Sequence, residues 1–125
     1  MNSKTRLIPR AATRVQFRLR IHRGEDIAIG PGKVALLEAV AETGSISAAA
    51  RQLGMSYRRA WLLIDQLNQA LQSPAVTTAT GGAHGGGASL TPVGEEVVRR
   101  YRAIENTARL AAAADIAALG RLLAP

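Results

Sequence analysis

The stretch from Ser45 to Leu71, SISAAARQLGMSYRRAWLLIDQLNQAL, constrains the fold of this chain more than any other. Ser47 is placed to cap a short helix over residues 48–53, and Gly54 suits the left-handed residue that follows a helix end. Ser56 is placed to cap a longer helix, because apolar residues then recur at helical spacing as far as about Leu71. Two helices joined by a short glycine turn predict a helix–turn–helix motif.

The start of the second predicted helix carries the residues expected to contact DNA, Ser56, Tyr57, Arg58 and Arg59. In a helix–turn–helix this end enters the major groove, where arginine is the commonest reader of guanine. Two positive charges there oppose the helix dipole and so lower the stability of the helix. Their position therefore favours a role in DNA binding over a structural role. Arg51, on the first helix, is predicted to contact phosphate. The alternative is that the arginines are only solvated.

The composition restricts both the core and the chemistry. Aromatic residues make up only 3% of the 125 residues, so the core of a single domain must be aliphatic and mainly helical. Trp61, the only tryptophan, is predicted to anchor the edge of the core rather than to stack on bases. The chain has no cysteine, no clustered metal ligands and no apolar run of about 18 residues. We therefore expect no enzyme, cofactor, metal or membrane span.

The positive charge is concentrated at the N-terminus. The net charge is +7, and residues 1–23 contain seven basic residues and no acid, so the nine remaining bases balance all nine acids. A basic arm over residues 1–13, predicted to be disordered, points to a polyanion such as nucleic acid. A solubilising tail is the alternative.

Residues 14–22 alternate between apolar and polar side chains, which predicts a half-buried strand. This strand is expected to pair either with the glycine-rich hairpin around residues 81–87 or with a second copy across a dimer. The following stretch, residues 22–32, is predicted to be a connection rich in turn residues. A first helix is then expected from about Lys33 to Glu42, and Gly44 is placed to end it.

Glycines dominate the segment from Gly81 to Gly87, between two short stretches with strand character. A phosphate-binding loop of the type GxxxxGK[ST] requires a lysine, but Ala88 stands at that position. The segment is therefore predicted to be the tip of a β hairpin, a wing that passes close to the DNA backbone. Its candidate DNA contacts are Gly82, His84 and Gly85.

A final helix is predicted to begin after the capping Thr91 and to continue to about Leu119, roughly 28 residues and about 42 Å. Its length favours pairing with a second copy over folding back on its own domain. The residues predicted to form the dimer contact share one side of the helix: Val97, Tyr101, Ile104, Ala108 and Ala111.

The segments GSISAAARQLGMSYRRAW and ATGGAHGGGASLT resemble the N-terminal DNA-binding domain of the ModE family of molybdate-responsive bacterial regulators, over residues 14–105. The resemblance implies a winged helix–turn–helix related to LysR-type regulators, DNA binding as a homodimer, and a link to molybdenum metabolism. The recognition helix carries over onto residues 56–59 and the wing onto 81–87. In ModE the molybdate-binding domains follow this region. Nothing up to Pro125 matches them, so no small-molecule effector is expected here.

We thus expect a mainly helical fold with a small β hairpin. Its parts are a disordered basic arm (1–13), a winged helix–turn–helix with an N-terminal strand (14–91) and a dimerisation helix (92–125). The expected function is that of a homodimeric transcriptional regulator, cytoplasmic and nucleoid-associated, that binds specific double-stranded DNA. The alternatives are a non-specific architectural DNA-binding protein and an adaptor that holds another protein through the long helix.

Overall fold

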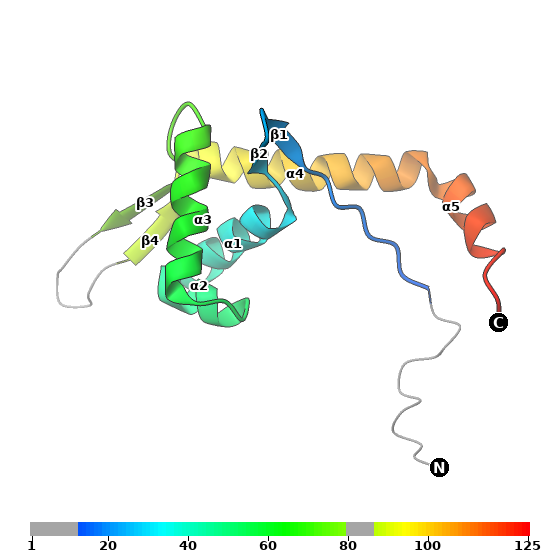
Figure 1. The fold of residues 1–125 in the computed structure, drawn as a ribbon, viewed down its shortest axis with the longest axis horizontal. Coiled ribbons are helices and arrows are strands. Elements are labelled where there is room, and N and C mark those ends of the chain that lie inside the picture. Colours follow the sequence, from blue (N-terminus) through cyan, green and yellow to red (C-terminus); the bar gives the residue numbers. More distant parts are fainter. Residues whose placement is uncertain (1–12, 80–86) are drawn as a thin grey trace, which may run out of the picture.

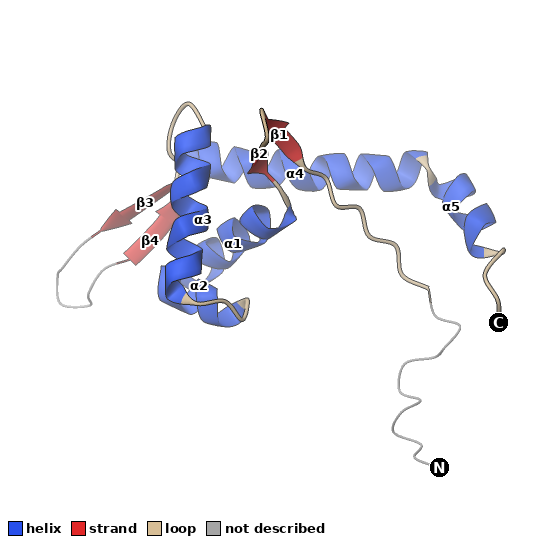
Figure 2. Cartoon of the chain, viewed as in Figure 1, coloured by secondary structure: helices blue, strands red, loops and turns tan. Residues whose placement is uncertain are grey.

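Helices dominate the structure, a computed structural model that describes residues 13–79 and 87–125 (Figure 2). Its elements are, in order, β1 (Ile21–Arg23), β2 (Asp26–Ile29), α1 (Pro31–Thr43), α2 (Ile46–Gln52), α3 (Tyr57–Ala70), β3 (Val76–Ala79), β4 (Gly87–Leu90), α4 (Pro92–Ala111) and α5 (Ala113–Gly120). The strands form two separate antiparallel hairpins. The predicted fold class, a mainly helical winged helix–turn–helix, is confirmed. Among the described helices, none has both the length and the hydrophobicity of a transmembrane span.

The core lies where α1, α2 and α3 pack against one another. Alanines occupy the contact between α2 and α3, which lets the two helix backbones approach closely. Ala49, Ala50 and Ala60 are each at most 2% exposed. Branched side chains from α1 and α3 fill the remaining space: Val34, Leu36, Leu37, Val40, Ile64 and Leu67. The core is aliphatic, as the composition predicted.

The wing, formed by β3 and β4, is attached to this core by hydrogen bonds. The strands pair from Val76 with Leu90 to Ala79 with Gly87. The side chain of Asn68 on α3 accepts a hydrogen bond from the backbone N–H of Ala75 (2.8 Å) and donates one to the carbonyl of Val76 (3.3 Å). Figure 1 shows the wing projecting away from the body beside α3. The predicted contacts Gly82, His84 and Gly85 lie outside the described residues.

The predicted strand over residues 14–22 is wrong for most of its length. Residues 14–20 form no strand, and β1 pairs instead with β2, inside the stretch predicted to be a connection. Gly24, with φ of +63°, turns the chain so that only the residues next to the turn find hydrogen-bonding partners. The alternation reflects partial cover of one face, where Phe17 and Leu19 are half-buried, rather than strand pairing.

The start of α2 also differs from its prediction. The capping residue is Ser45, not Ser47, because its backbone is extended and its hydroxyl accepts a hydrogen bond from the N–H of Ala48 (3.1 Å). The helix therefore begins two residues earlier than predicted. Gly44, with φ of +69°, ends α1 as predicted.

The prediction of a single long C-terminal helix is wrong. Thr91 caps α4 as predicted, and its hydroxyl accepts from the N–H of Gly94 (3.1 Å). The helix is then interrupted at Ala112, and the short α5 turns away from the axis of α4 (Figure 1). Asp115 lies in the first turn of α5, where a negative charge stabilises a new helix start.

Candidate nucleic-acid interface

The turn between α2 and α3 fixes the direction in which α3 leaves the core. Gly54 adopts the predicted left-handed conformation, with φ of +68°. The N–H of Met55 donates to the carbonyl of Ala50 (3.0 Å), which closes the turn onto α2. The hydroxyl of Ser56 accepts from the N–H of Arg59 (3.1 Å), so the predicted cap of α3 is confirmed. The first turn of α3 is therefore held rigidly at the protein surface.

Arg58 and Arg59 extend from this first turn into solvent. Both residues are exposed, and neither guanidinium forms an ion pair or hydrogen bond with any residue that the structure describes. No acidic residue lies in the first turn of α3. Among the described residues, none neutralises the positive charge at this helix start through an ion pair.

Arginines elsewhere in the chain behave differently. Arg102 on α4 forms a bidentate ion pair with Glu38 on α1, in which one N–O distance is 2.9 Å. It also forms an ion pair with Glu105, with an N–O distance of 2.7 Å. These hydrogen bonds raise the pKa of Arg102. Arg23 donates to the carbonyl of Ala70 (3.3 Å), at the end of α3. These arginines attach structural elements to each other, whereas those at the start of α3 do not.

A shallow hollow runs along the outer side of α3, and we refer to it as the α3 hollow. It is lined by Ser56, Arg58, Arg59, Trp61, Leu62 and Asp65. Tyr57 is 54% exposed and packs edge-on against Trp61, with ring centroids 6.3 Å apart. Trp61, predicted to anchor the edge of the core, lies a quarter turn from the buried stripe and is 37% exposed. Trp61 and Leu62 belong to the candidate site and were missed.

Arg51 lies in the last turn of α2, and its carbonyl accepts a hydrogen bond from the N–H of Gly54 (3.1 Å). Its side chain is exposed. The residue is thus next to the turn that leads into α3. This position is consistent with the phosphate contact predicted for it, which stays a prediction.

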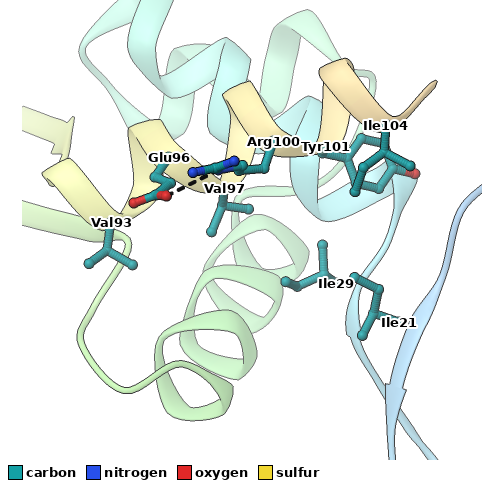
Figure 3. A pocket seen from close by; sticks show the side chains of 8 residues that line it. All are labelled: Ile21, Ile29, Val93, Glu96, Val97, Arg100, Tyr101 and Ile104. Carbon is teal, nitrogen blue, oxygen red and sulfur yellow. Dashed lines mark hydrogen bonds and ion pairs between the residues drawn. The ribbon is translucent and has the colours of Figure 1, made fainter. Parts of the chain in front are cut away.

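A second surface lies between the β1–β2 hairpin and α4, and we refer to it as the α4 groove (Figure 3). It has a volume of about 270 Å³. Its lining is apolar except for the ion pair between Glu96 and Arg100 (3.2 Å). Figure 3 shows two isoleucines of the hairpin facing the side chains of α4. The apolar lining residues are Ile21, Ile29, Val93, Val97, Tyr101 and Ile104.

The residues predicted for the dimer contact are divided between the chain's own core and its surface. Tyr101 is only 2% exposed, and its hydroxyl donates to the carbonyl of Leu19 (2.8 Å). Burial raises the pKa of Tyr101, and the charge of Glu105 adds to the shift. Val97 packs against the core, Ala108 is half-buried, and Ile104 and Ala111 are exposed. The contribution of Ile21 and Ile29 was missed, although Ile21 was one of the alternating apolar residues.

Comparison with known proteins gives a family match that runs from α1 to the start of α4, and it gives several individual relatives. The family described as "Bacterial regulatory helix-turn-helix protein, lysR family" matches residues 32–95. The chain is 53% identical over 77 residues to the "Molybdenum-pterin-binding protein MopB" of Rhodobacter capsulatus, covering 62% of this chain and 28% of that protein. It is 38% identical over 94 residues to the "Molybdenum transport protein ModE" of Azotobacter vinelandii, covering 75% and 35%.

A third relative is the "DNA-binding transcriptional dual regulator ModE" of Escherichia coli strain K12. The identity is 42% over 71 residues, which cover 57% of this chain and 27% of that regulator. The chain thus spans about a third or less of the length of these relatives. The matched part of the chain includes the α2–α3 turn, α3 and the wing strands.

Proposed function

Because the chain belongs to the lysR family of bacterial regulatory helix–turn–helix proteins, we propose that it acts as a homodimer that reads a specific operator through α3. The resemblance to the DNA-binding domain of ModE regulators is confirmed by the relatives. The chain is therefore a DNA-binding transcriptional regulator of this type. Sequence-specific reading, the residues that perform it and the homodimer are the proposal.

One observation carries the proposal: the uncompensated arginines at the capped start of α3. Arg58 and Arg59 are exposed, and the cap at Ser56 fixes the helix turn that carries them. A guanidinium that is already bound to a carboxylate would have to break that bond before it could reach a guanine. Arg58 and Arg59 have no such bond to break, since they form no ion pair with any described residue. We assign base contacts to them and phosphate contacts to Arg51, Ser56 and the wing.

The α4 groove supports the homodimer. Ile104 and Ile21 are 47% and 44% exposed at its edge, and α4 extends beyond the body of the domain (Figure 1). None of the described residues 106–120 is buried. An apolar groove beside a projecting helix offers a second copy a surface that would otherwise remain in contact with water. Two copies joined in this way present two α3 helices to half-sites about 34–36 Å apart.

The names of the relatives suggest the physiological setting. They are called molybdenum-pterin-binding, molybdenum transport and transcriptional regulatory proteins. We propose that the operator of this chain controls genes of molybdenum metabolism, and that the chain works in the bacterial cytoplasm at the nucleoid. We assign it no catalytic reaction, and no small-molecule effector to its described residues.

Selection of bound DNA from a random library is the direct test of this function. We expect the full chain to enrich a two-fold symmetric sequence. Similar affinity for the enriched sequence and for random DNA would instead favour an architectural DNA-binding protein. An absence of DNA binding at low salt would favour the adaptor.

Replacement of Arg58 or Arg59 by alanine should weaken binding to the selected operator by roughly 1–3 kcal/mol and relax the base preference at one position in each half-site. The reason is the loss of paired hydrogen bonds to guanine. Affinity for the operator and for its single-base variants, measured at fixed salt by fluorescence anisotropy, checks this expectation.

Arg99→Ala is the matched control, because it removes the same charge from an exposed arginine on α4. It should leave the base preference unchanged. Equal weakening on every DNA sequence by the Arg58 and Arg59 variants would mean that these side chains contact only phosphate.

Deletion of residues 1–12 should reduce the salt dependence of DNA binding. It removes Lys4, Arg6 and Arg10. Each phosphate neutralised contributes about 0.9 to the slope of log affinity against log salt, so the slope should fall by up to about 2.7 per protomer. Operator affinity measured between low and moderate salt gives the slope. An unchanged slope would identify the segment as a solubilising tail.

A further inference from the structure

The outward ridge of α3 contains one apolar side chain at its centre. Arg58, Leu62 and Asp65 follow each other at intervals of one helical turn, and all three line the α3 hollow. They lie on the side of α3 opposite the buried stripe of Ala60, Ile64 and Leu67. The ridge that Arg58 begins is therefore the part of α3 that faces an approaching partner most directly.

Leu62 is 52% exposed on this ridge. A single exposed leucine is ordinary on a protein surface. This one, however, lines the α3 hollow together with Trp61 and the two arginines, and Trp61 packs against the exposed Tyr57. On the floor of the major groove the matching apolar group is the C5-methyl of thymine, and no other base presents one.

We propose that Leu62 is a specificity-determining residue that contacts a thymine methyl group in each half-site. Leu62 is four residues beyond Arg58, which is about 6 Å along the helix, and base pairs are stacked about 3.4 Å apart. With the axis of α3 running along the groove, the thymine lies about two base pairs from the guanine that Arg58 reads. Asp65, one turn further on, carries a negative charge that the DNA phosphates repel. This inference rests on the proposed function.

Replacement of thymine by deoxyuridine tests the contact, because it removes only the methyl group. Each thymine of the selected operator is replaced in turn, and affinity is measured for the wild-type chain and for Leu62→Ala. The wild type should lose roughly fourfold in affinity at one thymine per half-site, as expected when the burial of one methyl group is lost. Leu62→Ala should lose almost nothing further at that thymine, because the two changes remove the same contact.

Two more variants make the outcome specific. Leu62→Met keeps an apolar side chain and should retain the sensitivity to the methyl group. Leu122→Ala removes a leucine that is 81% exposed near the C-terminus, and it should also retain the sensitivity. Circular dichroism checks that Leu62→Ala is folded, which its half-exposed position predicts.

Equal loss on deoxyuridine by the wild type and by Leu62→Ala would overturn the contact, and so would a sensitive thymine far from the guanine read by Arg58. In both cases the selected operator and the effect of Arg58→Ala would stand, so the proposed function would survive. Failure to select any sequence would overturn the proposed function and this contact together.

Discussion

Replacement of Gly94 by alanine is expected to destabilise the fold, although alanine is the better helix former. Gly94 is buried in the first turn of α4. A Cβ atom there would overlap the carbonyl oxygen of Ala75 and lie only 3.0 Å from its carbonyl carbon. The carbonyl oxygen of Ala75 also accepts a hydrogen bond from the N–H of Thr91 (2.9 Å). The side chain therefore cannot be accommodated unless α4 moves away from the start of the wing.

The segment that carries Ala75 is too firmly held to yield easily. The N–H of Ala75 donates to the side chain of Asn68, and the hydroxyl of Thr91 donates to the carbonyl of Pro74 (2.7 Å). Overpacking of this kind costs roughly 1–3 kcal/mol or more, which exceeds the gain of about 1 kcal/mol from better helix propensity. Urea unfolding at fixed protein concentration should therefore show a lower free energy of unfolding for Gly94→Ala.

Gly32→Ala is the matched control. Gly32 also lies in the first turn of a helix, α1, but a Cβ atom there would meet no atom within 4 Å. This variant should be as stable as the wild type or more stable by up to about 1 kcal/mol. A Gly94→Ala chain as stable as Gly32→Ala would show that α4 is not clamped against Ala75.

The features predicted correctly from sequence are those determined by neighbouring residues. The cap of α3 at Ser56, the left-handed Gly54 and the cap of α4 at Thr91 each depend on residues within one helical turn. The recurrence of apolar residues at helical spacing in α3 also predicted its buried face, which contains Ala60, Ile64 and Leu67. The helix–turn–helix and its arginines were therefore accessible from the sequence alone.

The features that were missed depend on contacts between distant segments. Gly94 is required by a carbonyl nineteen residues earlier, and the only local signal was a glycine inside a helix. Tyr101 was predicted on the dimer-contact side of the last helix, but it is buried, and its hydroxyl donates to the carbonyl of Leu19 near the N-terminus. Trp61 was predicted at the edge of the core, but it also lines the α3 hollow beside Arg58 and Arg59. Periodicity gives the faces of a helix but not what covers each face.

The largest effect on function is expected for Ile104→Asp. Ile104 is 47% exposed at the edge of the α4 groove, so the charge should not disturb the fold of a single chain. It would, however, be buried without a partner if a second copy covers the groove, and an unpaired buried charge is strongly unfavourable. We expect the variant to be monomeric at concentrations where the wild type is dimeric, as measured by sedimentation velocity.

Loss of the dimer should reduce affinity for the full operator by about 10²-fold or more, because the second half-site is no longer bound by a linked copy. Affinity for DNA with one half-site should hardly change, since α3 is untouched. Asn106→Asp adds the same charge on the opposite side of α4 and should remain dimeric. If Ile104→Asp remains dimeric with normal operator affinity, the α4 groove is not the dimer contact. If it is monomeric but still binds the full operator tightly, the two α3 helices do not act together.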